Sequence, residues 1–405
     1  MIVRIEPSFA AGTAAAPPSK SMSHRFLLCA GLAEGESVIR NVAESEDVLA
    51  TADCLNALGA SCVLRDGTAH VTGAAVTEPG APAVLPCRES GSTLRFFIPV
   101  SLLAEREVTF TGKGRLMQRP LGVYEDICRK QGITYEKAED HLRIRGRLRF
   151  GEYRLPGNVS SQFISGLLFA LPLLPGDSTL RLLPPVESRP YIDMTLQALS
   201  SFGVSAAWRE ENALFVPGGQ TYRAGEVIVE GDHSNAAFLQ ALSLCGGKVQ
   251  VTGLDKHSLQ GDRVFPAYLE RLRQGPAKLD IADCPDLGPV LFAAAALAHG
   301  GTFTGTDRLK LKESDRGRAM QTELAKFGVT QRAGANEMTV VNEGMHAPDA
   351  PLFGHNDHRV VMALSVLAVR TGGEITGAEA VNKSFPDFFA QLERLGVKLS
   401  YGLDQ

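Results

Sequence analysis

Basic side chains stand at the start of several predicted helices, and they are the residues best suited to chemistry. The stretches PSKSMSHR, ESGSTLR and NDHR, called here polar heads because each begins a predicted apolar helix, place a cation in or beside a first helical turn. These cations are Lys20 and Arg25, Arg95, and Arg359. A cation there opposes the positive end of the helix dipole, which is a mild penalty. The penalty is removed if an external anion lies between the free N–H groups and the cation. We therefore expect anion-binding helix starts, although a capped helix with solvated charges is the simpler interpretation of any single stretch.

Other polar stretches could add to such a site. NVSSQ is a fourth polar head, and GKGRLMQRP, RLKLKESDRGR and NKSFPDFF carry further cations, among them Arg115, Lys312, Arg316 and Lys383. Arginine can grip a phosphate or carboxylate with two N–H groups, whereas lysine acts as a point charge. Taken alone, each stretch is more often a solvated charge cluster.

These heads belong to a repeat that occurs six times. Each copy begins with a polar head and an apolar helix, starting near residues 19, 89, 158, 232, 284 and 356. A second helix in each copy stops at a glycine, which takes the left-handed conformation easily. These glycines are Gly59, Gly132, Gly203, Gly275, Gly328 and Gly396. The interval from Gly275 to Gly328 is shorter than the others, which predicts that one copy lacks part of its hairpin.

The repeat predicts an α/β (α+β) fold of two domains. The first helix of each copy is apolar on nearly all faces and belongs in an interior, whereas the second has one polar face. Each copy is then a strand, a buried helix, a strand, an outer helix and a hairpin. If the first helices of a domain run parallel, their starts converge on one face.

Composition excludes some classes of function. The formal charge is −4, from 41 basic and 45 acidic residues, which argues against a nucleic-acid-coating protein. Seven cysteines without a C-x-x-C pair predict free thiols in a reducing cytoplasm. The chain start lacks the pattern of a signal peptide, and the apolar runs are too short to span a bilayer.

Eight stretches in order resemble the 5-enolpyruvylshikimate-3-phosphate synthases of the enolpyruvyl transferase family. They are PSKSMSHR, ESGSTLR, GRLMQRP, GNVSSQFISGLL, SRPYIDMT, LKESDRG, NDHRVVMAL and KSFPDFF. The resemblance implies a two-domain inside-out α/β barrel with three repeats per domain, buried parallel helices and outer sheets. Domain one would combine residues 1–11 and 231–405, domain two would be residues 12–230, and the active site would lie in the cleft between the domains.

The resemblance also implies a reaction. Phosphoenolpyruvate would pass its enolpyruvyl group to the 5-hydroxyl of shikimate 3-phosphate and release phosphate, without a metal or organic cofactor. The two substrates together carry roughly −5 to −6 charges, since a phosphate monoester holds about −1.5 to −2. Seven cations of the matching motifs could balance them: Lys20, Arg25, Arg115, Lys312, Arg316, Arg359 and Lys383.

Site residues follow from the matching motifs. Phosphoenolpyruvate would contact Lys20, Gly91, Arg115, Gln162, Arg316, Arg359 and Lys383. Shikimate 3-phosphate would contact Lys20, Ser21, Arg25, Ser160, Ser161, Gln162, Ser188, Asp286 and Lys312. Asp286 is the expected base for the 5-hydroxyl and Glu313 the expected acid for the methylene carbon, with Lys20 and Lys383 as further catalytic residues. The simpler role for either carboxylate is a helix cap or a salt bridge.

Two positions depart from the family pattern. Arg308 stands where some members have Asn four residues before the site lysine, which bears on how the shikimate ring is held. ESGSTLR replaces a form like N-A-G-T but keeps Gly91, so the backbone can approach a ligand closely. We therefore expect glyphosate to inhibit in competition with phosphoenolpyruvate.

Three alternatives fit the sequence less well. The sister enzyme acting on UDP-N-acetylglucosamine carries a reactive Cys on the loop before an Arg-Pro pair, and TGKGRLMQRP has none. A non-catalytic scaffold could bind phosphorylated ligands or RNA, but the aromatic platforms and long basic runs that would favour RNA are missing. Zinc at His355 and His358 lacks a second ligand cluster, while His24 and His233 are expected to orient their neighbours. A monomer is the default expectation.

Overall fold

The computed structural model describes residues 1–402 and divides the chain into two compact units. Unit 1 joins Met1–Pro17 to the chain from Gly231 onward, and unit 2 is Pro18–Glu230. Residues 12–17 thus group with unit 1, six residues beyond the boundary expected from the sequence. The physical reason is that β2 (Ala11–Ala15) pairs in parallel with β17 (Lys248–Thr252) of unit 1.

Unit 2 holds three copies of the repeat, each with one buried helix and one outer helix. The buried helices are α1 (Lys20–Gly31), α3 (Gly91–Ser101) and α5 (Ser161–Ala170). The outer helices are α2 (Glu46–Ala57), α4 (Gly122–Gln131) and α6 (Arg189–Ser201), with short 3-10 turns η1 (Leu116–Gln118) and η2 (Leu171–Leu173). α1 is buried without a break from Met22 to Gly31, whereas α4 buries only three side chains. The apolar and amphipathic patterns therefore separate the two helix types as expected.

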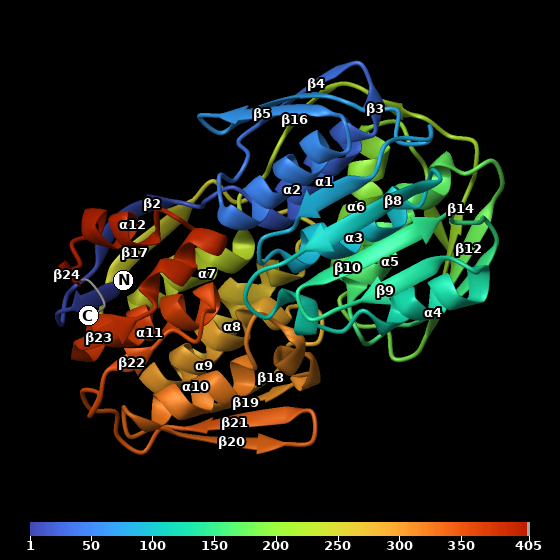
Figure 1. Cartoon of the computed structure of the whole chain (residues 1–405). Coiled ribbons are helices and arrows are strands. Elements are labelled where there is room, and N and C mark those ends of the chain that lie inside the picture. Colours follow the sequence, from blue (N-terminus) through green and yellow to red (C-terminus); the bar gives the residue numbers. More distant parts are fainter. Residues whose placement is uncertain (403–405) are drawn as a thin grey trace. The chain divides into compact units, whose positions relative to one another are not determined.

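Three four-stranded sheets of unit 2 share one strand order, and Figure 1 labels many of their strands. The first is β7 (Ala83–Pro86), β8 (Arg106–Thr111), β10 (His141–Gly146) and β9 (Thr134–Lys137). The second is β11 (Glu152–Pro156), β12 (Ser178–Leu183), β14 (Ala213–Val216) and β13 (Ala207–Glu210). The third is β16 (Glu226–Ile228), β4 (Glu36–Arg40), β6 (Thr68–Thr72) and β5 (Ser61–Arg65), beside the pair β15 (Tyr222–Arg223) and β3 (Ala33–Glu34).

The order has a simple origin. The first two strands of each sheet are parallel, as in β7–β8, and the hairpin then adds two antiparallel strands. A helix between two strands allows the parallel pair, and a short turn allows the antiparallel one. In the third sheet, β16 from the far end of the unit takes the place of the strand that precedes α1.

Unit 1 repeats the same design. Its buried helices are α7 (His233–Ala241), α9 (Gly288–Leu297) and α11 (His358–Thr371), and its outer helices are α8 (Phe265–Gln274), α10 (Arg316–Ala325) and α12 (Phe388–Arg394). Its 3-10 turns are η3 (Leu242–Cys245), η4 (Gly261–Val264), η5 (Pro285–Leu287), η6 (Asp307–Leu311) and η7 (Ala378–Lys383). Every residue of α9 from Gly288 to Ala296 is buried, so this helix forms the centre of the apolar core of unit 1.

The sheets of unit 1 show where the repeat is incomplete. One sheet is β18 (Ala277–Asp280), β19 (Gly301–Thr304), β21 (Glu337–Val341) and β20 (Thr330–Gly334). Another is β22 (Leu352–Phe353), β23 (Gly373–Thr376), β1 (Ile2–Ile5) and β24 (Leu399–Gly402). The third has only β17 and β2, because β18 follows α8 directly and no hairpin intervenes. This confirms the missing hairpin.

The conformations of two glycines show why the interval from Gly275 to Gly328 is short. Gly132 ends α4 with φ 70°, the left-handed conformation that turns the chain back into a hairpin. Gly275 ends α8 with φ 165°, which is extended backbone leading straight into β18. The sixth copy is completed from the other end of the chain, since β1 pairs with both β23 and β24 (Figure 1).

No helix within residues 1–402 combines the length and the apolar character needed to cross a membrane.

Candidate active site

The N-terminal turn of each buried helix, together with its cap, is called here a helix mouth. At the mouth of α1, Ser19 accepts a hydrogen bond from the N–H of Met22 at 3.3 Å. Lys20 Nζ lies 2.8 Å from Asp47 Oδ2 in the first turn of α2. Since Thr93 at the mouth of α3 contacts the Asp47 carbonyl at 3.4 Å, these two mouths lie close together.

Arg25 is a buried cation that the protein does not pair with a carboxylate within residues 1–402. It is 3% exposed, and its guanidinium donates to the carbonyls of Ser21 and Tyr191 at 2.7 and 2.9 Å. Its Nε donates to Thr195 Oγ1 at 2.9 Å. Burial lowers the pKa of Arg25 to about 10. A buried, uncompensated charge is costly, so an external anion at this place would be stabilising.

The mouths of α3 and α5 are joined by side chains. Arg95 donates to Gln162 Oε1 at 2.6 Å, and Gln162 Nε2 donates to Ser92 Oγ at 2.9 Å. Ser160 caps α5 by accepting from the N–H of Gln162 at 3.3 Å, and Ser161 is buried beside it. The predicted residues Ser160, Ser161 and Gln162 therefore lie at one place in unit 2.

Gly91 opens α3 in a space too small for a side chain. A Cβ at this position would lie 2.4 Å from Nη1 and 2.6 Å from Cζ of Arg119. Arg119, which is 8% exposed, belongs to the same stretch as the predicted Arg115 but was not itself predicted to bind substrate. Arg119 is identified as a candidate site residue by its distance to Gly91, which cannot be read from the sequence.

Two predicted residues of unit 2 stand apart from these contacts. Arg115 is exposed on the loop before η1, and its side chain forms no hydrogen bond or ion pair within residues 1–402. Ser188 is 2% exposed and precedes α6 in the left-handed conformation, at φ 56°. Its carbonyl accepts from the N–H of Tyr191, whose own carbonyl accepts from Arg25. Ser188 thus shapes the turn that faces Arg25.

In unit 1, three helix mouths meet at Arg359. This residue lies in the first turn of α11, and its Nη2 donates to Ser234 Oγ of α7 at 3.0 Å. The same nitrogen donates to Asp286 Oδ2, on η5 just before α9, at 3.1 Å. The convergence expected from the polar heads is therefore present in this unit.

Two donor nitrogens of Arg359 are not used by the protein within residues 1–402. Its Nε and Nη1 are buried and have no hydrogen-bond partner within residues 1–402. Burial alone would lower the pKa of Arg359, but Asp286 raises it above its usual value, so the side chain is charged. Nε and Nη1 lie on different edges of the charged guanidinium, so each can donate singly to an oxygen of a carboxylate or phosphate, and a two-pronged grip would also need Nη2.

Arg316 holds three carboxylates beside that position. It donates to Asp286, Glu313 and Asp357 at 2.8, 2.7 and 2.9 Å, and its side chain is 1% exposed. Burial alone would lower the pKa of Arg316, but the three carboxylates together raise it above its usual value. Asp357 was not predicted as a site residue, although its place as the cap of α11 in NDHR was a usable signal.

Lysines complete the cluster. Lys312 Nζ lies 3.1 Å from Asp286 Oδ1. Burial lowers the pKa of Lys312 despite the attraction of Asp286, and Arg316 and Arg308 lower it further. Lys383 is 7% exposed and donates to the carbonyl and side chain of Asn356 at 2.7 Å, two residues before α11.

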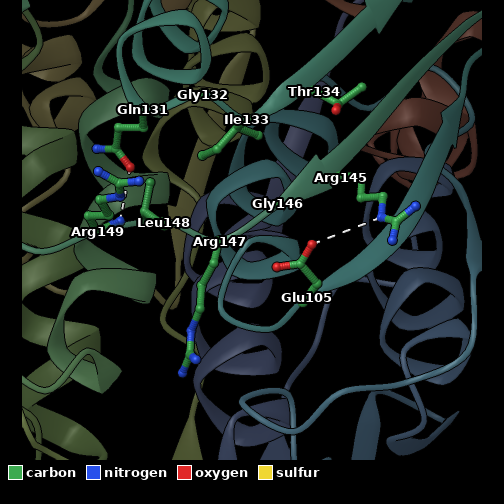
Figure 2. Close-up of a pocket in the computed structure, with 10 residues that line it drawn as sticks. All are labelled: Glu105, Gln131, Gly132, Ile133, Thr134, Arg145, Gly146, Arg147, Leu148 and Arg149. Carbon is green, nitrogen blue, oxygen red and sulfur yellow. Dashed lines mark hydrogen bonds and ion pairs between the residues drawn. The ribbon is translucent and has the colours of Figure 1, made fainter.

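The helix mouths are separate from a surface pocket of unit 2. That pocket has a volume of about 450 Å³ and is lined by the end of α4, the start of β9 and the strand β10 with its following loop. It contains none of the predicted site residues. Figure 2 shows Arg145 turned toward Glu105, its ion-pair partner at 4.0 Å, while Arg147 and Arg149 point elsewhere. Because these arginines do not converge, the pocket is a poor candidate for the active site.

The two histidines considered for zinc have other surroundings. His355 Nε2 lies 2.9 Å from Glu323 Oε1, and His358 is fully buried in α11. Within the described part of the chain, no group of three or more His, Cys, Asp or Glu side chains is placed to hold a metal ion.

Comparisons with known proteins agree on one family. The family model described as EPSP synthase (3-phosphoshikimate 1-carboxyvinyltransferase) matches residues 6–392. A protein of Clostridium kluyveri named 3-phosphoshikimate 1-carboxyvinyltransferase is 38% identical, over 97% of this chain and 97% of its own. One of Clostridium perfringens with the same name is 37% identical, over 97% and 98%. A solved structure of EPSP synthase from Acinetobacter baumannii aligns with a TM-score of 0.79 at 24% identity, covering 99% of this chain and 100% of that one, which supports the fold.

Proposed function

The chain belongs to the EPSP synthase family, and we propose that its helix mouths carry out that family's reaction with the residue roles given below. The enzyme is a transferase of the shikimate pathway. It moves the enolpyruvyl group of phosphoenolpyruvate to the 5-hydroxyl of shikimate 3-phosphate and releases phosphate, on the way to aromatic amino acids.

The two unfilled donor nitrogens of Arg359 are the observation that carries the proposed roles. Nε and Nη1 are buried where α7, α9 and α11 begin, so an incoming oxyanion meets both these donors and the positive ends of helices. Phosphoenolpyruvate carries a carboxylate and a phosphate, and we assign one of them to Arg359. Lys383, Arg316, Lys20, Gly91, Arg115 and Gln162 are the other proposed contacts of this substrate.

Shikimate 3-phosphate is assigned mainly to the mouths of unit 2. Arg25 is buried without a carboxylate partner there, which supports binding of an anionic group of this substrate. The hydroxyl-bearing Ser21, Ser160, Ser161 and Ser188, the amide of Gln162 and the cation of Lys20 suit its phosphate and ring oxygens. Asp286 and Lys312 are also proposed contacts of this substrate.

Two proton transfers accompany the proposed chemistry. Asp286 accepts the proton of the 5-hydroxyl as that oxygen bonds to C2 of phosphoenolpyruvate, and Glu313 gives a proton to the methylene carbon. The carbon is now a methyl group, and one of its protons returns to Glu313 as the bond from C2 to the phosphate oxygen breaks, while Lys20 and Lys383 offset the negative charge. A positioned carboxyl contributes about 10²- to 10⁴-fold in such a step. No metal or organic cofactor takes part.

Asp286 has several cationic partners before substrate arrives. Its two oxygens contact Arg316, Arg359 and Lys312 at 2.8 to 3.1 Å. A carboxylate so engaged is a weak base, and a substrate anion that takes over Arg359 would release one of its oxygens. Substrate binding would thus prepare Asp286 for proton transfer.

Phosphate release is the test of these roles. We expect release only when both substrates are present, and a large loss of kcat in Lys20→Ala and Asp286→Ala. UDP-N-acetylglucosamine in place of shikimate 3-phosphate should give no release. Full activity in both variants would remove the site assignment, and turnover with the nucleotide sugar would remove the acceptor.

We also propose that the enzyme works as a monomer in the cytoplasm. Its seven cysteines are all buried and free, which suits a reducing compartment. Elution at about twice the mass of one chain in size-exclusion chromatography with light scattering would exclude the monomer.

A further inference from the structure

A chain of buried hydrogen bonds runs from α1 to the mouth of α3 in unit 2. His24 Nδ1 lies 2.7 Å from Thr51 Oγ1, and Thr51 Oγ1 lies 2.8 Å from Thr93 Oγ1. Thr93 Oγ1 donates to Ser90 Oγ at 2.7 Å. All four side chains are at most 1% exposed. None of them is a substrate contact in the roles assigned above.

The direction of donation follows from the end of the chain at Ser90. A threonine hydroxyl has one proton, and that of Thr93 is used on Ser90, because the other acceptor, the carbonyl of Asp47, is 3.4 Å away. Thr51 therefore donates to Thr93, and His24 donates from Nδ1 to Thr51. The ring of His24 must carry its proton on Nδ1.

His24 has the surroundings of a neutral ring. Burial, with smaller effects of Lys20 and Arg25, lowers its pKa well below the usual value. Its Nε2 is buried and has no hydrogen-bond partner in the described residues. The ring packs edge-on against Phe96 of α3, with centroids 6.5 Å apart. A neutral ring with its proton on Nδ1 leaves a lone pair, not an N–H, in this apolar surrounding.

The chain ends on the residue that shapes the α3 mouth. Ser90 is the cap of α3 and also accepts from the backbone N–H of Thr93 at 3.2 Å. Its backbone leads into Gly91 and Ser92, whose N–H groups lie in the first helical turn, where no helix carbonyl can accept from them. The cap hydroxyls of the neighbouring helices, Ser19 and Ser160, accept a backbone N–H and have no hydrogen bond to another side chain within residues 1–402. Ser90, in contrast, is fixed by a hydrogen-bonded chain of three further side chains, Thr93, Thr51 and His24.

We propose that His24, Thr51 and Thr93 form a positioning relay, which holds the Ser90 cap and the N–H groups of Gly91 and Ser92 in the orientation that binds phosphoenolpyruvate. This inference rests on the proposed function, because it takes the α3 mouth as part of that substrate's site. Burying four polar side chains has a desolvation cost that apolar residues of the same shape would avoid. A role in orienting the α3 mouth accounts for that cost.

The test interrupts the relay without changing its shape. Thr93→Val and Thr51→Val keep the branched side chain and lose the hydroxyl. We expect KM for phosphoenolpyruvate to rise ~3- to 10-fold, on the scale of a lost helix cap, with kcat changed less than about twofold. KM for shikimate 3-phosphate should stay as it is. Thr93→Ser restores the hydroxyl and should restore KM.

A control and a double variant separate positioning from plain stability. Ser101→Ala alters a buried hydroxyl at the opposite end of α3 and should leave both KM values unchanged. The double variant Thr51→Val with Thr93→Val should be no worse than Thr93→Val alone, since both changes interrupt one chain. Thr variants with a lower Tm but wild-type KM for phosphoenolpyruvate would overturn the proposal. It would also be overturned if the double variant raised this KM by the product of the two single effects.

Nitrogen-15 NMR of the His24 ring gives a readout that does not depend on activity. We expect the proton on Nδ1 in the wild type, and a proton on Nε2 would overturn the relay. Gly91→Ala distinguishes a failure of the relay from a failure of the proposed phosphoenolpyruvate site. If that change raises KM for phosphoenolpyruvate while the Thr variants do not, the relay is wrong and the proposed site stands. If Gly91→Ala also has no effect, the α3 mouth is not part of the site and the relay falls with it.

Discussion

Replacing Gly91 by alanine tests whether the α3 mouth binds phosphoenolpyruvate. The added methyl would lie 2.4 Å from Nη1 of Arg119, which is nearly buried, and 2.9 Å from its Nη2. An ordinary contact of a methyl carbon is about 3.5 Å or more, so the guanidinium must move by roughly 1 Å. The expected result is a narrower and displaced anion site with an otherwise intact helix.

The size of the effect follows from the displaced cation. The clashing atoms are the far end of a flexible side chain, so the fold can adapt, and the ligand loses a charged hydrogen bond of about 1.5–3 kcal/mol, which corresponds to roughly 10- to 150-fold in affinity. We expect KM for phosphoenolpyruvate and the inhibition constant of glyphosate both to rise within that range, because we expect the two compounds to compete for the α3 mouth. Stability should not fall, since alanine is a better helix former than glycine.

The assay is initial-rate phosphate release with shikimate 3-phosphate saturating and both phosphoenolpyruvate and glyphosate varied. Gly122→Ala is the matched control, because a Cβ at Gly122 meets nothing within 4 Å although this residue also opens a helix. An unchanged glyphosate inhibition constant in Gly91→Ala would refute the assignment of this mouth. Equal changes in the two variants would refute it as well, since they would show a general effect of the substitution.

Three further predictions concern unit 1. Arg359→Lys should raise KM for phosphoenolpyruvate about 10-fold or more, since a charged hydrogen bond contributes about 1.5–3 kcal/mol and lysine cannot replace the several donors of the planar guanidinium. An unchanged KM would remove Arg359 from the site. Because the pKa of Lys312 is lowered, its charge is lost at a pH below the usual lysine range, and kcat/KM for shikimate 3-phosphate should fall there. In Lys312→Arg the pH at which kcat/KM falls should be higher. An unchanged pH profile would contradict the role of Lys312 in binding this substrate. Burial alone would raise the pKa of Glu323, but His355, Lys326 and the N–H of Phe353 lower it overall, so its stabilising effect is present above the usual pKa of glutamate and lost as pH falls below it. Glu323→Gln should therefore lower Tm at neutral pH and flatten the acid dependence of Tm with little change in kcat, and a wild-type acid profile would count against this.

Local patterns accounted for most of the fold. The apolar helices, their polar heads and the missing hairpin could be predicted because each depends on a short stretch of residues. Pairings between distant residues could not be predicted. β1 completes the sheet of the last copy, where Ile2 lies opposite Thr376 and Gly402, and no short-range signal marks such a partner.

The site shows the same division. Lys20, Arg25, Gly91 and Arg359 could be chosen from the heads, because a cation or glycine at a helix start has a physical meaning by itself. The approach of Arg119 to Gly91 depends on two elements packing together, so the sequence could not single out Arg119. Arg308 donates to the carbonyl of Ala282 at 2.5 Å and lies near enough to affect Lys312, which identifies it as a further cation of this cluster.

The two units balance their buried cations in different ways, and this has a consequence for the order of binding. In unit 1, Arg316 and Arg359 are paired with the carboxylates of Asp286, Glu313 and Asp357, so a substrate anion must compete with them. In unit 2, Arg25 is held by two carbonyls and a hydroxyl, so an anion adds to it without displacing a charge.

An anion that displaces nothing binds more favourably than one that must break an ion pair, other contacts being equal. Shikimate 3-phosphate, assigned to Arg25, should therefore bind the free enzyme before phosphoenolpyruvate does. Calorimetric titration with each substrate alone checks this order, because phosphoenolpyruvate binding tightly to the free enzyme would show that the carboxylates of unit 1 are no barrier.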